Sequence, residues 1–267
     1  MQILALLTME RPRAYTGKDL CDEKTRLLSW MTPIDHQETI IGQYVKSADG
    51  KKPAFQDEED VPDGSKCATF CAAVAHINNE RWSGVPILLK AGKGRLLVFQ
   101  HQCRTFTGSA LEKTGALVTV NFHSTPNALI FDEMTPNRMI IRVQPDEGIF
   151  LRVNTLVPDL EVKTEAVDLD MSYRGTQVPE AYEALLFDAM KGVYSRRVRA
   201  DEIDASWTLW APMLKYLEEE DITPREYSYG ESYTQVPGAK LSLTLIGSTG
   251  PQGLEEFVAS CQSKVPR

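Results

Sequence analysis

Runs of strand-forming residues follow one another along the middle of the sequence, and this order limits the fold more than any other feature. The runs begin at Cys67 and are rich in branched and aromatic residues: "CATFCAAVAHI", "VPILLKA", "RLLVFQ", "ALVTVNF", "NRMIIRVQ", "GIFLRVNT" and "LEVKTEAVDLDMSY". Short connections, not helices, join them. Strands joined in this way pair as antiparallel neighbours, because parallel neighbours need a long crossover. The sequence therefore predicts an α+β fold with an antiparallel sheet, and not a doubly wound parallel one.

Helical patterns flank these runs on both sides. Apolar residues from Ile3 to Leu7 predict a helix that ends at "ERPRAYTG", and "KDLCDEKTRLLSWMTPI" predicts a second helix that Pro33 ends. After the strands, "PEAYEALLFDAMKG" opens with Pro and closes with Gly, and "ADEIDASWTLWAPMLKYLEEE" has acids in its first turn. Residues 47–65 are polar and rich in turn formers, which is typical of a surface loop.

The composition excludes several classes of protein. The formal charge is −8, and Lys and Arg are scattered among acids, so the sequence lacks the basic patch that is typical of a nucleic-acid-binding protein. The five cysteines are an odd number at irregular spacings, which favours reduced thiols in an intracellular compartment, in the cytoplasm or an organelle, over secretion. Cys67 and Cys71 are better interpreted as buried structural thiols than as half of a metal site. The apolar start of the chain lacks a basic region and is too short to span a membrane.

Residue types alone do not identify a catalytic site. The four histidines are isolated from one another, and no dinucleotide-binding glycine fingerprint follows a strand. The stretch "KAGKG", from Lys90 to Gly94, lacks the spacing of a phosphate loop, which favours an exposed basic turn over an anion site. Arg142 and Gln144 share one face of a predicted strand, where either a polar cavity or a solvent-exposed edge would satisfy them. The exposed edge is the simpler interpretation.

A set of sequence blocks, in this order, resembles the C-terminal domain of glucose-6-phosphate dehydrogenase: "MERP", "DEKTRLL", "GQYV", "NERWSGVPILLKAGK", "IRVQPDE", "DLDMSY", "PEAYEALLFDA" and "RADEIDASWTLWAPML". The blocks run from the first residues to about Leu217. The resemblance implies one domain over residues 1–267, with a large, mostly antiparallel sheet backed by helices. In the family this sheet forms the dimer interface, so the resemblance also implies a homo-oligomer.

The resemblance also implies ligands for particular residues. Lys93 matches a lysine that reaches the sugar phosphate substrate, Gln144 matches a second substrate contact, and Lys113 is the nearest match to a further substrate-binding cation. In some members a structural NADP site lies on this domain. Its contacts match Lys90, Arg142, Arg152 and Asp170, with Lys90 in place of an arginine and Phe150 in place of a stacking tyrosine.

Two departures from the family pattern affect the expected function. No stretch of these residues resembles the family's coenzyme domain, and the resemblance would put the catalytic base immediately before Met1, so we expect no catalysis by this chain alone. Insertions are expected near residues 94–121 and 231–246. The primary hypothesis is therefore a part of a glucose-6-phosphate dehydrogenase that oxidises glucose 6-phosphate with NADP. The alternative is a non-catalytic subunit whose sheet docks in a larger assembly.

Overall fold

The computed structural model of the chain describes residues 1–47, 49–92, 116–122, 137–144, 147–157, 163–172, 181–193 and 195–228. Its contacts divide the chain into two compact units. The helical unit consists of Met1–Asp35, Ala75–Val85 and Arg174–Glu220, and the sheet unit of His36–Val74, Pro86–Tyr173 and Asp221–Arg267. Each unit is described by itself.

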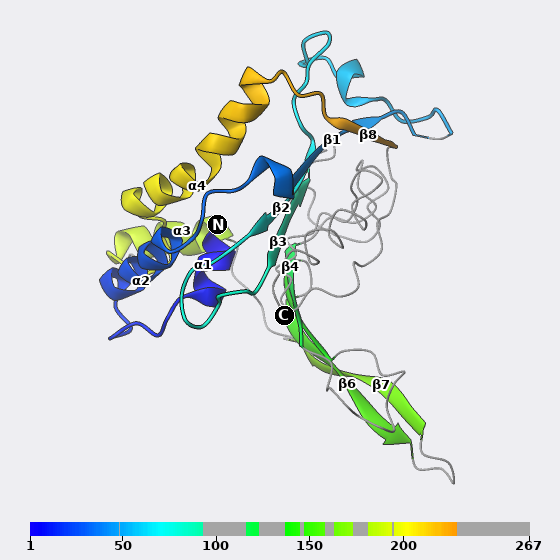
Figure 1. Cartoon of the computed structure of the whole chain (residues 1–267). Helices are drawn as coiled ribbons and strands as arrows, with labels where there is room; N and C mark the ends of the chain where they lie inside the picture. Colours follow the sequence, from blue (N-terminus) through cyan, green and yellow to red (C-terminus); the bar gives the residue numbers. More distant parts are fainter. Residues whose placement is uncertain are drawn as a thin grey trace. The chain divides into compact units, whose positions relative to one another are not determined.

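The helical unit contains the four described α-helices, α1 (Gln2–Thr8), α2 (Gly17–Ser29), α3 (Ala181–Met190) and α4 (Ala200–Glu219), which are labelled in Figure 1. Thr16 is the N-cap residue of α2, because its hydroxyl accepts a hydrogen bond from the Asp19 amide at 3.1 Å. The apolar face of α2 packs against both α1 and α4. The core of the unit is formed by Leu4, Leu20, Leu27, Leu28, Leu209 and Met213, all buried.

A buried ion pair crosses this core. Lys24 Nζ on α2 lies 2.8 Å from Glu202 Oε2 on α4, and both side chains are 1% exposed. The same ammonium donates to Gln2 Oε1 at 3.0 Å and to the Arg197 carbonyl at 3.2 Å. Lys24 therefore joins α1, α2 and α4 through one charged group.

The segment Ala75–Val85, between β2 and β3 in the chain, is part of the helical unit. Ile77 pairs with Met31 in an isolated bridge, and the Asn78 amide donates to the Trp30 carbonyl at 2.8 Å. Trp82 Nε1 donates to the Thr8 carbonyl at 2.8 Å, which satisfies one of the unpaired carbonyls at the end of α1. This segment is thus fixed at the ends of two helices.

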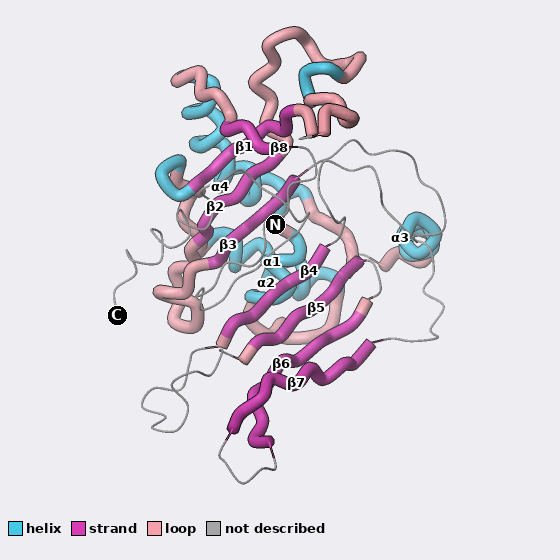
Figure 2. Tube along the Cα trace, turned by 90° about the vertical axis from the view of Figure 1, so that its right-hand side faces the viewer, coloured by secondary structure: helices cyan, strands magenta, loops and turns pink. Residues whose placement is uncertain are grey.

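The sheet unit holds two four-stranded sheets, whose strands Figure 2 shows in succession. The first has the order β3-β2-β1-β8, and comprises β1 (Thr39–Val45), β2 (Phe70–Ala75), β3 (Ile87–Gly92) and β8 (Arg225–Ser228). β1 is antiparallel to β2 and parallel to β8. The second sheet has the order β4-β5-β6-β7, and comprises β4 (Ala116–Asn121), β5 (Arg138–Gln144), β6 (Gly148–Val157) and β7 (Lys163–Ser172). All of its pairings are antiparallel.

This architecture confirms the predicted α+β class with mostly antiparallel sheets. Six of the predicted strand runs coincide with β2 to β7, while "RLLVFQ" lies outside the described residues. The analysis of strand runs missed β1 and β8, which are seven and four residues long. The second predicted helix ends at Ser29, earlier than Pro33, because Trp30 already donates its amide to Leu27 and Leu28 in a closing turn. The expected loop at residues 47–65 contains a short 3-10 helix, Phe55–Asp57.

Candidate functional site

The predicted substrate contacts fall largely outside the described part of the chain. Lys93 and Lys113 are both outside it, as is most of the expected insertion at 94–121 and all of that at 231–246. Gln144 is the last residue of β5, and only its backbone is described. Lys90 lies on β3 of the first sheet and is half-buried.

Three of the four predicted NADP contacts lie together on one face of the second sheet. Successive residues of a strand point to opposite faces, so Arg142 on β5, Arg152 on β6 and Asp170 on β7 can be assigned to faces from the strand register. Phe150 is opposite Asp170, and Arg152 is two positions further along the same strand. We call this side, with Arg142, Phe150, Arg152, Asp168 and Asp170, the polar face.

An arginine covers an aromatic ring at one end of the polar face. The guanidinium carbon of Arg142 lies 4.5 Å from the centre of the Phe150 ring. Arg142 is paired across the strands with Gly148, which has no side chain, so the guanidinium has room to turn towards the diagonal neighbour Phe150. Such a stacked guanidinium is held over the ring by a cation–π attraction. This geometry places a flat, positively charged surface beside Asp170, the residue opposite Phe150.

A second arginine is held by a carboxylate. Arg152 Nε and its terminal nitrogen donate to the two oxygens of Asp168, each at 2.7 Å. This fork-to-fork pair lowers the pKa of Asp168 and raises that of Arg152, in each case chiefly through the side-chain hydrogen bond. The sequence analysis did not identify Asp168. Its position two residues before Asp170 in "DLD" was a usable signal, because alternation puts both carboxylates on one face.

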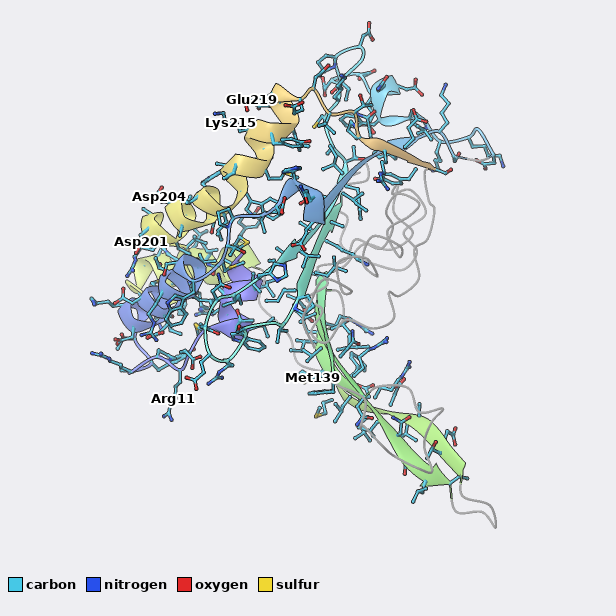
Figure 3. The ribbon with its side chains drawn as sticks, in the orientation of Figure 1. Arg11, Met139, Asp201, Asp204, Lys215 and Glu219 are labelled. Atoms are coloured by element: carbon cyan, nitrogen blue, oxygen red, sulfur yellow. The ribbon has the colours of Figure 1, made fainter. Side chains whose placement is uncertain are left out.

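The opposite side of this sheet is apolar. Register and alternation assign Val118, Met139, Ile141, Leu151, Leu169 and Met171 to it, and Met139 is labelled in Figure 3. On β7, Val167, Leu169 and Met171 are 37%, 49% and 54% exposed. We call this side the apolar face.

The described cysteines differ in environment. Cys71 lies on β2 and is partly buried, and burial raises the pKa of its thiol to about 11. Cys67 is exposed, so the expectation that it is a buried structural thiol was wrong. It lies in the loop before β2, outside the strand itself.

The helical unit contains a cavity that no predicted site residue lines. Its volume is about 300 Å³, and its lining is mostly apolar: Met1, Gln2, Val198, Glu202, Ile203, Ser206, Trp207 and Trp210. Within the described ranges, no cluster of three or more His, Cys, Asp or Glu side chains is arranged to bind a metal. No described helix has the length and apolar character needed to cross a membrane.

Comparison with known proteins relates this arrangement to one family. The family described as "Glucose-6-phosphate dehydrogenase, C-terminal domain" matches residues 1–97 and 105–242. Among curated relatives, glucose-6-phosphate 1-dehydrogenase of Emericella nidulans is 40% identical over 97% of this chain, which covers 45% of that protein. The Saccharomyces cerevisiae enzyme is 36% identical over 100% of the chain, or 47% of its own length. The chloroplastic enzyme 1 of Arabidopsis thaliana is 40% identical over 86% of the chain, or 39% of its own length.

Solved structures give the same result. A glucose-6-phosphate dehydrogenase in complex with its substrate glucose-6-phosphate matches with a TM-score of 0.80 and 36% identity, over 100% of this chain and 49% of that one. The glucose-6-phosphate 1-dehydrogenase of Mycobacterium avium matches with a TM-score of 0.68 and 27% identity, over 86% of this chain and 44% of that one. The chain spans about half or less of the length of each of these proteins. The chain belongs to the glucose-6-phosphate dehydrogenase family and corresponds to its C-terminal domain.

Proposed function

We propose that this chain supplies the substrate-binding half of a glucose-6-phosphate dehydrogenase, which oxidises glucose 6-phosphate with NADP to 6-phosphogluconolactone. The observation that carries the proposal is the family match, which runs through both compact units. This supports treating residues 1–267 as one family domain. The 267 residues contain no dinucleotide-binding glycine fingerprint, so we expect NADP-dependent turnover to require a coenzyme-binding half as well.

Three residues are proposed to hold the substrate. Lys93 and Lys113 would each present an ammonium with three donors to the sugar phosphate, and Gln144 would both donate to and accept from a sugar hydroxyl. The position of Gln144 supports this assignment, because it ends β5 two residues after Arg142. At a strand end a side chain reaches a ligand without disturbing the hydrogen bonds of the sheet.

Calorimetric titration of the chain with glucose 6-phosphate tests this proposal. We expect Lys93→Ala to weaken binding by about tenfold or more, since hydrogen bonds to charged groups contribute about 1.5–3 kcal/mol. Lys46→Ala is the matched control, because Lys46 is 64% exposed and belongs to the loop after β1. Undetectable binding, or equal binding by all three proteins, would contradict the substrate assignment. NADPH formation by the chain alone, followed by absorbance, would contradict the requirement for a second half.

A structural NADP site is proposed at Lys90, Arg142, Arg152 and Asp170. The polar face supports it, because three of these residues share one face of one sheet and Arg142 stacks on Phe150. A stacked ring and guanidinium suit a planar base, and a carboxylate suits a ribose hydroxyl. Thermal unfolding with and without NADP tests the site. We expect stabilisation of the native chain and loss of that effect in Phe150→Ala and Arg142→Gln.

The second candidate function is docking through the sheet, and we propose a second copy of the chain as the partner. The observation that favours it is the apolar face, where three neighbouring side chains on β7 are at least 37% exposed. Exposed apolar surface of this kind is typical of interfaces. Light scattering after gel filtration should show a dimer, and Leu169→Glu should convert it to monomers. Glu165→Lys, a charge change on the same face and strand, is the control. A larger assembly with other proteins is the alternative that co-purification would reveal.

The state of the cysteines indicates the type of cellular compartment in which the chain functions. Cys21, Cys67 and Cys71 are all free thiols. We propose a reducing intracellular compartment, the cytoplasm or an organelle, in agreement with the odd number of cysteines.

A further inference from the structure

A row of four polar side chains crosses the second sheet from one edge to the other. The strand register pairs Asn121 on β4 with Arg138 on β5, Arg138 with Arg152 on β6, and Arg152 with Asp168 on β7. All four residues therefore lie side by side on the polar face. Arg138 was not a predicted site residue, and the resemblance assigns a ligand to only one member of the row, Arg152.

The centre of this row brings two positive charges together. Residues directly opposite on antiparallel strands have Cβ atoms about 4.5–5.5 Å apart, and like charges at such positions destabilise the sheet. Burial, and secondarily the charge of Arg152, lower the pKa of Arg138. The row itself holds two cations and one anion, Asp168. The centre of the row, where Arg138 faces Arg152, is therefore positively charged.

Each of these two guanidiniums is held by its other neighbour in the row. Arg138 Nε donates to Asn121 Oδ1 at 2.8 Å, and Asn121 is 7% exposed. Arg152 is held on its other side by the two oxygens of Asp168. A buried neutral amide thus accepts the hydrogen bond from Arg138 Nε and positions the guanidinium. Preorganised guanidiniums lose little side-chain entropy when they bind an anion.

We propose that a phosphate group binds between Arg138 and Arg152. A phosphate offers several acceptor oxygens to two guanidinium forks, and its charge removes the repulsion between them. The inference deepens the NADP site proposed above, and it rests on that proposal only for the source of the phosphate. Arg142 and Phe150 lie further along the same face, so a nucleotide could occupy the two regions together.

Calorimetric titrations of the native chain with NADP, NAD and inorganic pyrophosphate test this inference. We expect Arg138→Gln to weaken binding of NADP by about tenfold or more. If the 2′-phosphate occupies the site, NAD binding stays unchanged; if the pyrophosphate group occupies it, NAD and NADP binding weaken alike. Either result supports the inference and identifies the phosphate. Arg225→Gln, which alters an exposed arginine on β8, is the matched control.

Unfolding of the ligand-free variants completes the test. Arg138→Gln removes a like charge but also the hydrogen bond to Asn121, so we expect its free energy of unfolding to fall by about 1 kcal/mol or less, a loss that leaves the ligand-free variant folded for the titrations. Arg138→Lys keeps the positive charge but lacks the planar guanidinium, so we expect it to bind NADP more weakly than the native chain and more tightly than Arg138→Gln. Pyrophosphate binding that depends on Arg138 without NADP binding would overturn the nucleotide site and support the phosphate site. Equal affinities of native chain and Arg138→Gln for all three ligands, or no binding of any, would overturn the inference.

Discussion

Removing the buried ammonium of Lys24 should destabilise the helical unit strongly. In Lys24→Met the apolar stem is kept, but Glu202 is left as a buried carboxylate 1% exposed to solvent. Breaking a buried ion pair by removing one partner costs about 3–5 kcal/mol, because the remaining charge is kept from water and has lost its partner. Glu202 Oε2 accepts no hydrogen bond of normal geometry from the described residues, so its stabilisation depends on nearby cations: the ammonium of Lys24 and, electrostatically, the N-terminal ammonium of Met1. Because Met1 still compensates part of the charge in the variant, the lower part of this range is expected.

Tryptophan fluorescence during urea unfolding measures this effect selectively. The four tryptophans, Trp30, Trp82, Trp207 and Trp210, all belong to the helical unit. The matched control is Lys215→Met, which breaks an exposed pair with Glu219 on α4; both residues are labelled in Figure 3. That exposed pair should contribute about 0.5 kcal/mol or less.

A double variant tests the physical reason for the loss. Lys24→Met combined with Glu202→Leu should recover most of the stability, because replacing both members of a buried pair with apolar groups is often neutral. A loss below about 1 kcal/mol in the single variant would refute the reasoning, since a buried unpaired charge costs more than that. A double variant as unstable as the single one would show that packing, and not charge, is responsible.

Three further predictions concern single groups. Because burial raises the pKa of Cys71 to about 11, we expect it to react with iodoacetamide at pH 8 far more slowly than Cys67, and site-resolved mass spectrometry should find similar rates only in urea. Trp82→Phe removes the hydrogen bond to the Thr8 carbonyl, so the free energy of unfolding followed by circular dichroism should fall by about 1 kcal/mol; an unchanged value would exclude a role for this bond in stability. The lowered pKa of Asp168 means that its contribution to stability is present above its ordinary pKa and is lost as pH falls through the lower folded value. NMR titration should find that midpoint below about 3.9, and a midpoint at or above it would contradict the observed pair.

The sequence by itself predicted the types of most elements and much of the polar face. Strand runs and helical periodicity located β2 to β7 and the four α-helices of the described residues, because these patterns depend on residues close together in the chain. Alternation of side chains along a strand was enough to predict that Arg142 and Gln144 lie on the same face. The resemblance then added Arg152 and Asp170, which the register brings to the face that carries Arg142.

Only the tertiary structure decided which residues become neighbours. β8 pairs in parallel with β1, which is about 180 positions earlier, and four residues carry too little pattern to predict such a pairing. Lys24 and Glu202 resemble solvated charges in sequence, yet α2 and α4 bury them together. The register of β5 on β6, likewise, sets Arg138 opposite Arg152. Local patterns specify backbone conformation and faces, whereas register, burial and charge pairing depend on contacts between distant segments.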